Sequence, residues 1–260
     1  MFSGMTALVT GSTSGIGLAI AEAFAAKGAD VVVNSFSDTA ADHAIAERLR
    51  KEHGVNSIYL KADMAKGDEC RALVDKTMVH MGRLDILINN AGIQFVSPVE
   101  TFPVERWDAI IAINLTAAFH TIAAAIPHMR SAGFGRIVNI ASAHGLRASP
   151  NKSAYVAAKH GVVGLTKTVA LELAGHGVTC NAVCPGFVLT PLVETQIVDR
   201  MKETGLDRET TVRDVILQKQ PSKQFASLGD IAAATLFLAS PDAAQITGTT
   251  LSIDGGWTAQ

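Results

Sequence analysis

The chain has 260 residues, of which 48% are apolar and 18% charged, and its formal net charge is −2. This length and apolar content predict one large domain with a sizeable core. The nearly balanced charge, without a basic cluster, argues against a nucleic-acid partner. No apolar stretch approaches the ~20 residues of a membrane span and no leader pattern is visible, so we expect a cytoplasmic protein with no membrane partner. The three cysteines lack ligand-type clustering, so we expect no metal site.

Short apolar runs alternate with helical patterns along the chain. The early runs are continuously apolar, which is typical of a parallel sheet covered by helices on both faces. We therefore predict an α/β fold, and the absence of linkers predicts a single domain over residues 1–260. Strands are expected at residues 7–9, 31–33, 58–60, 84–88, 137–140, 178–183 and 250–253. Helices are expected at residues 16–27, 39–53, 68–81, 104–129 and 230–239, and another is expected to begin at Ser153 as its N-cap.

The segment 189–221 interrupts this alternation. It is long and rich in charged residues, and we expect two short helices separated at Gly205. Such an insertion in a compact domain is often a lid over a site. The alternative is that segment 189–221 is a surface insertion with no role at the site.

A glycine-rich loop follows the first predicted strand. Gly11, Gly15 and Gly17 permit a tight turn and a close approach of the backbone to a pyrophosphate at the helix N-terminus. The spacing is G-x3-G-x-G, which differs from the commonest dinucleotide motif, G-x-G-x-x-G. Its position at the first strand–helix junction of an α/β chain favours nucleotide binding.

The tip of the second strand predicts which nucleotide is used. In dinucleotide folds this tip faces the adenine ribose. Here it reads Asn34-Ser35-Phe36, and neither Lys nor Arg occurs between Lys27 and Arg48. Without a cation to neutralise a 2′-phosphate, we expect NAD to be preferred over NADP.

Tyr155 and Lys159 are candidates for acid/base chemistry. They are four residues apart and therefore share one face of a helix. A phenol with its ordinary pKa near ~10 is a poor base at neutral pH, and a neighbouring ammonium lowers that pKa. Ser142, at the end of an apolar strand, could hydrogen-bond a carbonyl or hydroxyl held against Tyr155. The alternative is an amphipathic helix with both side chains on its surface.

The order of these motifs resembles the short-chain dehydrogenase/reductase family over essentially the full chain. The resemblance rests on the glycine loop, on Asn89-Asn90-Ala91-Gly92, and on Tyr155-x3-Lys159 together with Ser142. It implies a Rossmann fold with seven parallel strands, and a homotetramer. It also implies that Tyr155 is the general acid/base, that Lys159 lowers its pKa and binds the nicotinamide ribose, and that Ser142 orients the reacting oxygen. Asn114 would hold a water that relays protons. The cofactor-binding residues implied are Gly11, Thr13, Ser14, Gly15, Ile16, Gly17, Phe36, Asp63, Met64, Asn90, Gly92, Tyr155, Lys159, Pro185, Gly186, Val188, Thr190 and Leu192.

A further set of residues resembles the branch of this family that acts on D-3-hydroxybutyrate. Positions just past strand ends, or in the possible lid, are where open α/β sheets gather ligand contacts. A carboxylate bound there by a lysine, with amide and imidazole donors around it, would be a charge-assisted cluster. Phe187 departs from the tryptophan expected in that branch. The substrate-binding residues implied are Gln94, Ser142, His144, Lys152, Tyr155, Phe187, Gln196 and Trp257.

The expected activity is thus NAD-dependent oxidation of a small 3-hydroxy acid. Two alternatives stay open from the sequence. One is reduction of a 3-oxoacyl thioester or another short-chain alcohol or ketone, and the other is a catalytically silent nucleotide-sensing protein.

Overall fold

The computed structural model describes residues 1–260, except for the side chain of Leu192. Seven strands of this described chain form one parallel sheet in the order β3-β2-β1-β4-β5-β6-β7. The predicted Rossmann-like α/β architecture is confirmed. The strands are β1 (Thr6–Val9), β2 (Asp30–Ser35), β3 (Ser57–Lys61), β4 (Ile86–Asn89), β5 (Gly135–Ile140), β6 (Val178–Pro185) and β7 (Thr250–Ile253).

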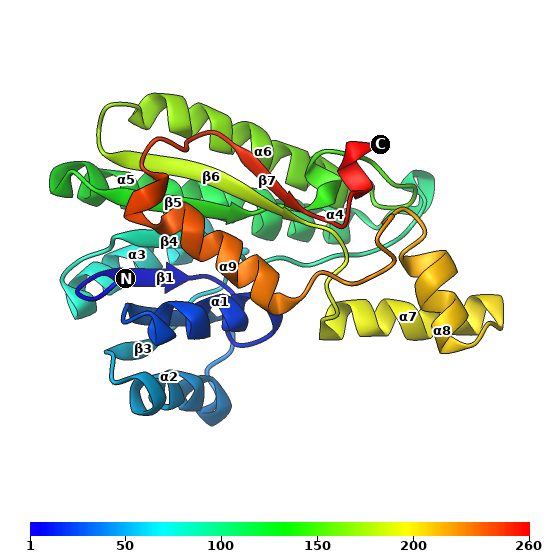
Figure 1. The fold of residues 1–260 in the computed structure, drawn as a ribbon, viewed down its shortest axis with the longest axis horizontal. Coiled ribbons are helices and arrows are strands. Elements are labelled where there is room, and N and C mark those ends of the chain that lie inside the picture. Colours follow the sequence, from blue (N-terminus) through cyan, green and yellow to red (C-terminus); the bar gives the residue numbers. More distant parts are fainter.

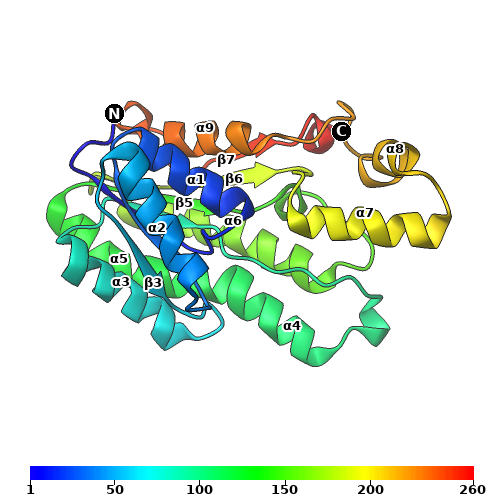
Figure 2. The same ribbon diagram turned by 90° about the horizontal axis from the view of Figure 1, so that it is seen from below.

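Helices cover both faces of this sheet, so most of the strand residues are buried (Figures 1 and 2). One face carries α1 (Gly15–Ala26), α2 (Ala40–His53) and α9 (Leu228–Ala239), whose apolar side chains share a core with β1 and β2. The opposite face carries α3 (Gly67–Met81), α5 (Ala117–Ala132) and α6 (Ser153–Leu173). Burial on both faces explains why the central strands read as uninterrupted apolar runs.

Local signals set several of the helix ends. Thr39 and Ser227 cap α2 and α9, each in a reciprocal capping box with the aspartate three residues later. Gly54 and Gly205 end their helices in the left-handed conformation, with φ of 68° and 70°.

The predicted helix at residues 104–129 differs in one respect. It runs as α4 (Val104–Ile111), a π-helical segment (Ala112–Thr116) and α5, and Pro127 lies inside α5. A π segment arises from i→i+5 hydrogen bonding, which leaves no periodicity to read in so short a stretch.

The predicted N-cap of α6 is wrong by one residue. Lys152 occupies the N-cap position, and Ser153 is the first helical residue. The Ser153 hydroxyl is buried without a hydrogen-bond partner in the described chain. Serine is a residue type that commonly caps helices, but the turn before Ser153 places Lys152 at the N-cap position.

The expectation that no stretch approaches a membrane span is wrong by length and composition alone, because the helical stretch Val104–Ala132 is long and apolar enough to cross a membrane. Its α5 part packs against α3 and the sheet, and places Ile122, Ala125 and Met129 in the core. Such packing is usual for a helix within a globular domain.

The segment 189–221 folds as α7 (Pro191–Thr204), α8 (Arg208–Thr210) and a π-helical segment (Thr211–Ile216). The predicted separation at Gly205 is confirmed. These helices project beyond the carboxyl ends of the strands (Figure 1). They have a small core of their own, built on Val193, Ile197 and Leu217.

Candidate active site

The glycine loop at residues 11–17 turns sharply between β1 and α1. Gly11 and Gly15 have φ of 60° and 55°, a region that other residues rarely adopt. A Cβ atom at Gly17 would lie 2.3 Å from the main-chain oxygen of Gly11, so no side chain fits there. The side chain of Ser14, the N-cap of α1, makes no capping hydrogen bond within the described chain. The first N–H groups of α1 therefore remain available to an anion.

Asn90 joins this loop to the end of β4. Its Nδ2 atom donates to the main-chain oxygens of Thr10 and Gly11, at 3.0 and 2.9 Å. Asn90 thus packs directly against the glycine loop.

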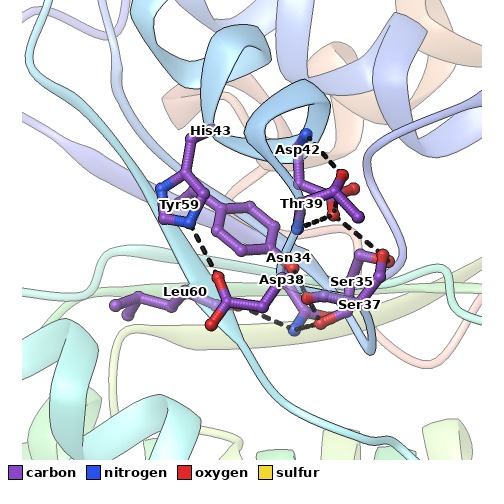
Figure 3. Close-up of polar contacts among 9 residues, drawn as sticks. All are labelled: Asn34, Ser35, Ser37, Asp38, Thr39, Asp42, His43, Tyr59 and Leu60. Atoms are coloured by element: carbon purple, nitrogen blue, oxygen red, sulfur yellow. Dashed lines mark hydrogen bonds and ion pairs between the residues drawn. The ribbon is translucent and has the colours of Figure 1, made fainter.

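A polar network supports the tip of β2 (Figure 3). The Asp42 carboxylate accepts hydrogen bonds from the Ser37 hydroxyl at 2.8 Å and from the N–H and hydroxyl of Thr39 at 2.9 and 2.8 Å. The Thr39 N–H contributes most to lowering the pKa of Asp42. The Tyr59 hydroxyl donates to the main-chain oxygens of Ser35 and Ser37. These contacts fix the backbone that presents residue 36.

Phe36 is the most exposed residue at this tip, with 74% of its surface accessible. It follows Asn34, whose side chain is fully engaged with the main chain of Gly11 and Leu60. Lys61 lies opposite Ser35 in the β2–β3 register. We did not predict Lys61 at this tip, because only residues close to the end of β2 in the sequence were considered.

A cavity of about 720 Å³ runs along the carboxyl edge of the sheet. This edge is where doubly wound folds bind nucleotides. The structure therefore brings most of the predicted site residues to one place. Those that line the cavity are Gly11, Thr13, Ser14, Gly15, Ile16, Gly17, Phe36, Asp63, Met64, Asn90, Gly92, Gln94, Ser142, His144, Lys152, Tyr155, Lys159, Pro185, Gly186, Phe187, Val188, Thr190, Gln196 and Trp257.

Two predicted residues stand apart, and several lining residues were missed. The side chain of Leu192 lies outside the described residues, and Asn114 lines a smaller neighbouring cavity. The missed residues are mostly small or apolar neighbours of predicted ones, which carry no chemical signal of their own. They are Asn34, Ser35, Ala62, Ala65, Ala91, Ile93, Ile113, Ile140, Ala141, Pro191 and Val193.

Tyr155 and Lys159 lie one turn apart on α6. The Lys159 ammonium is 5.7 Å from the centre of the Tyr155 ring and donates to the main-chain oxygen of Ile140 at 2.8 Å. The Ser142 hydroxyl, just past β5, accepts a hydrogen bond from the His144 N–H at 3.1 Å. The side chains of Tyr155, Lys159 and Ser142 thus line one cavity at the carboxyl end of β5.

Burial dominates the protonation of this pair. It raises the pKa of Tyr155, with the Ser142 hydroxyl acting in the opposite direction. It also lowers the pKa of Lys159 to about 8. The expectation that Lys159 lowers the pKa of Tyr155 is therefore not met, because removal from water disfavours the charged form of each group.

Asn114 lies in the π-helical segment between α4 and α5. Its Oδ1 atom accepts from the Ile93 N–H and its Nδ2 atom donates to the Ile93 oxygen, both at 2.9 Å. The cavity beside it has a volume of about 10 Å³ and is also lined by Lys159 and Thr10. This is close to the space that one water molecule needs.

The opposite end of the main cavity gathers the predicted substrate residues. His144 Nε2 and Gln94 Nε2 are buried and have no hydrogen-bond partner in the described chain. The Lys152 ammonium lies 5.6 Å from the centre of the Phe187 ring, and no carboxylate pairs with it among the described residues. Trp257 stacks on Phe187 with ring centres 5.5 Å apart.

Positive charge and burial shape the electrostatics here. Burial, together with Arg200 and Lys219, lowers the pKa of Lys152 to about 8. Burial and the nearby Lys152 lower the pKa of His144 to about 3, so its imidazole is neutral at physiological pH. Among the described residues, this end of the cavity thus presents the Lys152 cation without an acidic partner, together with unsatisfied polar atoms of His144 and Gln94, an arrangement that favours a small anionic ligand.

The chain is similar to known proteins over almost its whole length. A family model described as enoyl-(acyl carrier protein) reductase matches residues 11–258. The chain is 54% identical to a D-beta-hydroxybutyrate dehydrogenase of Cupriavidus necator, covering 100% of both chains. It is 53% identical to a protein of the same name from Rhizobium meliloti, covering 98% of this chain and 99% of that protein. A 3-oxoacyl-[acyl-carrier-protein] reductase of Staphylococcus epidermidis is 37% identical over 96% of this chain and 98% of that protein.

The solved structures agree. The crystal structure of levodione reductase matches with a TM-score of 0.91 and 34% identity, covering 100% of this chain and 99% of that chain. The chain therefore belongs to the short-chain dehydrogenase/reductase family, whose members are oxidoreductases that use a nicotinamide cofactor.

Proposed function

We propose that this enzyme catalyses the reversible oxidation of D-3-hydroxybutyrate to acetoacetate with NAD. The observation that carries the proposal is Lys152, half-buried and without an acidic partner among the described residues, in the same cavity as His144, Gln94 and Tyr155. A substrate carboxylate would satisfy these three groups together. The names of the relatives at 53% and 54% identity support the same substrate.

The cavity suits a dinucleotide on two counts. The glycine loop has no room for a side chain at Gly17, and the N–H groups that begin α1 have no side-chain cap from Ser14. Phosphate oxygens are the ligands such a helix start prefers. NAD, when bound, supplies the hydride acceptor.

We assign the protein's part of the chemistry to four side chains. Tyr155 removes the hydroxyl proton of the substrate, and in the reverse direction returns it to the ketone oxygen. Ser142 donates to that oxygen and keeps it against Tyr155. Lys159 supplies positive charge, and the small cavity beside Asn114 would hold a water through which the proton leaves. Gln196 and Trp257 complete the wall around the acid.

NAD rather than NADP is proposed because the exposed tip residue is Phe36 and not a cation. Lys61, on the neighbouring strand, is absent from the described lining of the cavity. A 2′-phosphate would therefore lack a counter-charge at this tip.

We further propose that residues 1–260 act as one catalytic domain, that segment 189–221 closes over bound substrate, and that the enzyme is a cytoplasmic homotetramer. Exposed apolar side chains on α4, α5 and α6 support self-association, among them Val104, Phe119 and Leu171. Light scattering coupled to size exclusion tests the oligomeric state.

An absorbance assay for NADH tests the proposed activity. The purified enzyme is given NAD or NADP with D-3-hydroxybutyrate, L-3-hydroxybutyrate, longer 3-hydroxy acids and a 3-hydroxyacyl thioester. We expect the highest kcat/KM with NAD and the D-acid. Preference for the thioester with NADP would instead assign the 3-oxoacyl reductase activity, and no turnover with any substrate would favour a nucleotide-sensing protein.

A further inference from the structure

Three segments that are far apart in sequence meet behind the substrate end of the cavity. They are the loop after β5, the end of segment 189–221, and residues 258–260. We call the four residues that join them, Arg147, Lys219, Thr258 and Gln260, the Arg147 junction.

Arg147 is the centre of this junction. Its guanidinium donates to the main-chain oxygen of Thr258 at 3.1 Å and to that of Gln260 at 3.0 and 3.2 Å. The Gln260 side chain donates to the main-chain oxygen of Lys219 at 3.1 Å. The Lys219 ammonium donates to the Ser149 hydroxyl at 3.3 Å and so contacts the same loop that carries Arg147.

The junction adjoins a wall of the substrate site. Trp257 directly precedes Thr258 and is 4% exposed. Its ring packs edge-on against His144 at 4.9 Å and stacks on Phe187 at 5.5 Å, with only 5° between the ring planes. The position of Trp257 thus sets the position of two other groups that line the cavity.

The two glycines before Trp257 make its position depend on hydrogen bonds to the surrounding chain. Gly255 and Gly256 both have left-handed φ, 57° and 89°. Glycine loses more conformational freedom on ordering than other residues, so external restraints matter more here. The Asp254 carboxylate supplies restraints, because it accepts from the N–H groups of Gly256 and Thr258 at 3.1 and 2.8 Å. The Ser222 N–H donates to the Gly255 oxygen at 3.1 Å. Arg147 supplies a further restraint, on the residues that follow Trp257.

We infer that Arg147 is a positioning residue for substrate binding, and that it acts by holding residues 258–260 so that Trp257 keeps His144 and Phe187 in place around the acid. This inference rests on the proposed function for the identity of the acid. Arg147 does not line the described cavity, so its effect is on affinity for the acid and not on hydride transfer or NAD binding.

The test uses Trp257 as its own reporter. The chain has two tryptophans, so Trp107→Phe leaves Trp257 as the sole source of indole fluorescence. In that background, Arg147→Ala and Arg147→Lys are compared with Arg130→Ala. Arg130 is a matched control, because it is exposed and donates to the main-chain oxygen of Glu172, away from the cavity.

We expect Arg147→Ala to raise KM for D-3-hydroxybutyrate by about 3- to 10-fold, with kcat and KM for NAD changed less than about 2-fold. Acrylamide should quench Trp257 more strongly than in the background protein. Arg147→Lys should restore part of both properties. Arg130→Ala should change neither.

Two outcomes would overturn the inference. One is unchanged quenching and unchanged KM in Arg147→Ala, and the other is an equal rise in KM for the acid and for NAD. If the wild-type enzyme fails to oxidise the acid at all, the proposed function fails. The quenching comparison then still reports whether Arg147 holds Trp257.

Discussion

The Lys159 ammonium lies 5.7 Å from the centre of the Tyr155 ring, one helical turn further along α6. It is directed to the Ile140 oxygen rather than to the phenol. Lys159 is buried and Tyr155 is half-buried, and removal from water shifts the pKa of each toward its neutral form, upward for Tyr155 and downward for Lys159. We therefore propose that the phenolate needed for alcohol oxidation forms when the oxidised nicotinamide is bound, because its positive charge would favour the ionised phenol.

This relationship predicts the tyrosinate titration of the ligand-free protein. The chain has two tyrosines, and burial raises the pKa of Tyr59 to about 12 and that of Tyr155 above its ordinary value. We expect no tyrosinate absorbance in the ligand-free protein below about pH 10. A tyrosinate signal near pH 8 that disappears in Tyr155→Phe would show instead that Lys159 alone activates the phenol.

Lys152→Ala tests the proposed carboxylate site. Removing the unpaired cation should raise KM for D-3-hydroxybutyrate by about 10- to 100-fold, because a charge-assisted hydrogen bond is lost from a buried site. KM for a neutral ketone such as 2-butanone should change little. Lys167→Ala, on the exposed side of α6, is the control. Equal effects on the acid and the ketone would count against carboxylate binding at Lys152.

His144 predicts an acid-sensitive contribution to stability. Its pKa is lowered to about 3 in the folded protein, whereas an unfolded chain protonates histidine near pH ~6.5. Between these values the unfolded state binds more protons, so stability is lost as the pH falls below about 6.5. When the pH is lowered from 7.5 to 5.0, the unfolding free energy of the wild type should fall by about 2 kcal/mol more than that of His144→Gln.

Denaturant unfolding at the two pH values measures this difference. His176→Gln, on the exposed turn after α6, is the control for removing a histidine. An identical loss of unfolding free energy in His144→Gln and the wild type would mean that His144 is not held neutral.

Much of this architecture could be predicted from the sequence, because its physical signals are local. Runs such as residues 31–33 are buried on both faces, Gly11 has a positive φ, and a Cβ atom at Gly17 would clash with the backbone of Gly11 in the same loop. Most of the site residues were implied by the family resemblance, and parallel strands bring them together because their carboxyl ends meet at one edge.

The parts that were not predicted depend on three-dimensional surroundings. The π segment at Asn114 reflects a hydrogen-bond register with no sequence period. The upward pKa shift of Tyr155 reflects burial, which the spacing of Tyr155 and Lys159 does not reveal. Lys61 comes beside the β2 tip only through strand pairing.

Phe36 predicts how the nucleotide preference can be changed. Phe36→Arg places a cation at the exposed tip of β2, where a 2′-phosphate would lie. The ratio of kcat/KM for NADPH to that for NADH should rise by about 10-fold or more. Phe36→Leu, which removes the ring without adding charge, should leave the ratio low. Wild-type enzyme that already prefers NADPH would overturn the assignment of NAD.

Tyr155→Phe tests the central claim most directly, because it removes a single oxygen atom and leaves the ring packing intact. With D-3-hydroxybutyrate and NAD, kcat should fall by about 10²- to 10⁴-fold, while the affinity for NADH, measured by its fluorescence on binding, stays close to that of the wild type. Near-normal turnover in Tyr155→Phe, with NADH bound as tightly as before, would contradict the assignment of Tyr155 as the proton acceptor.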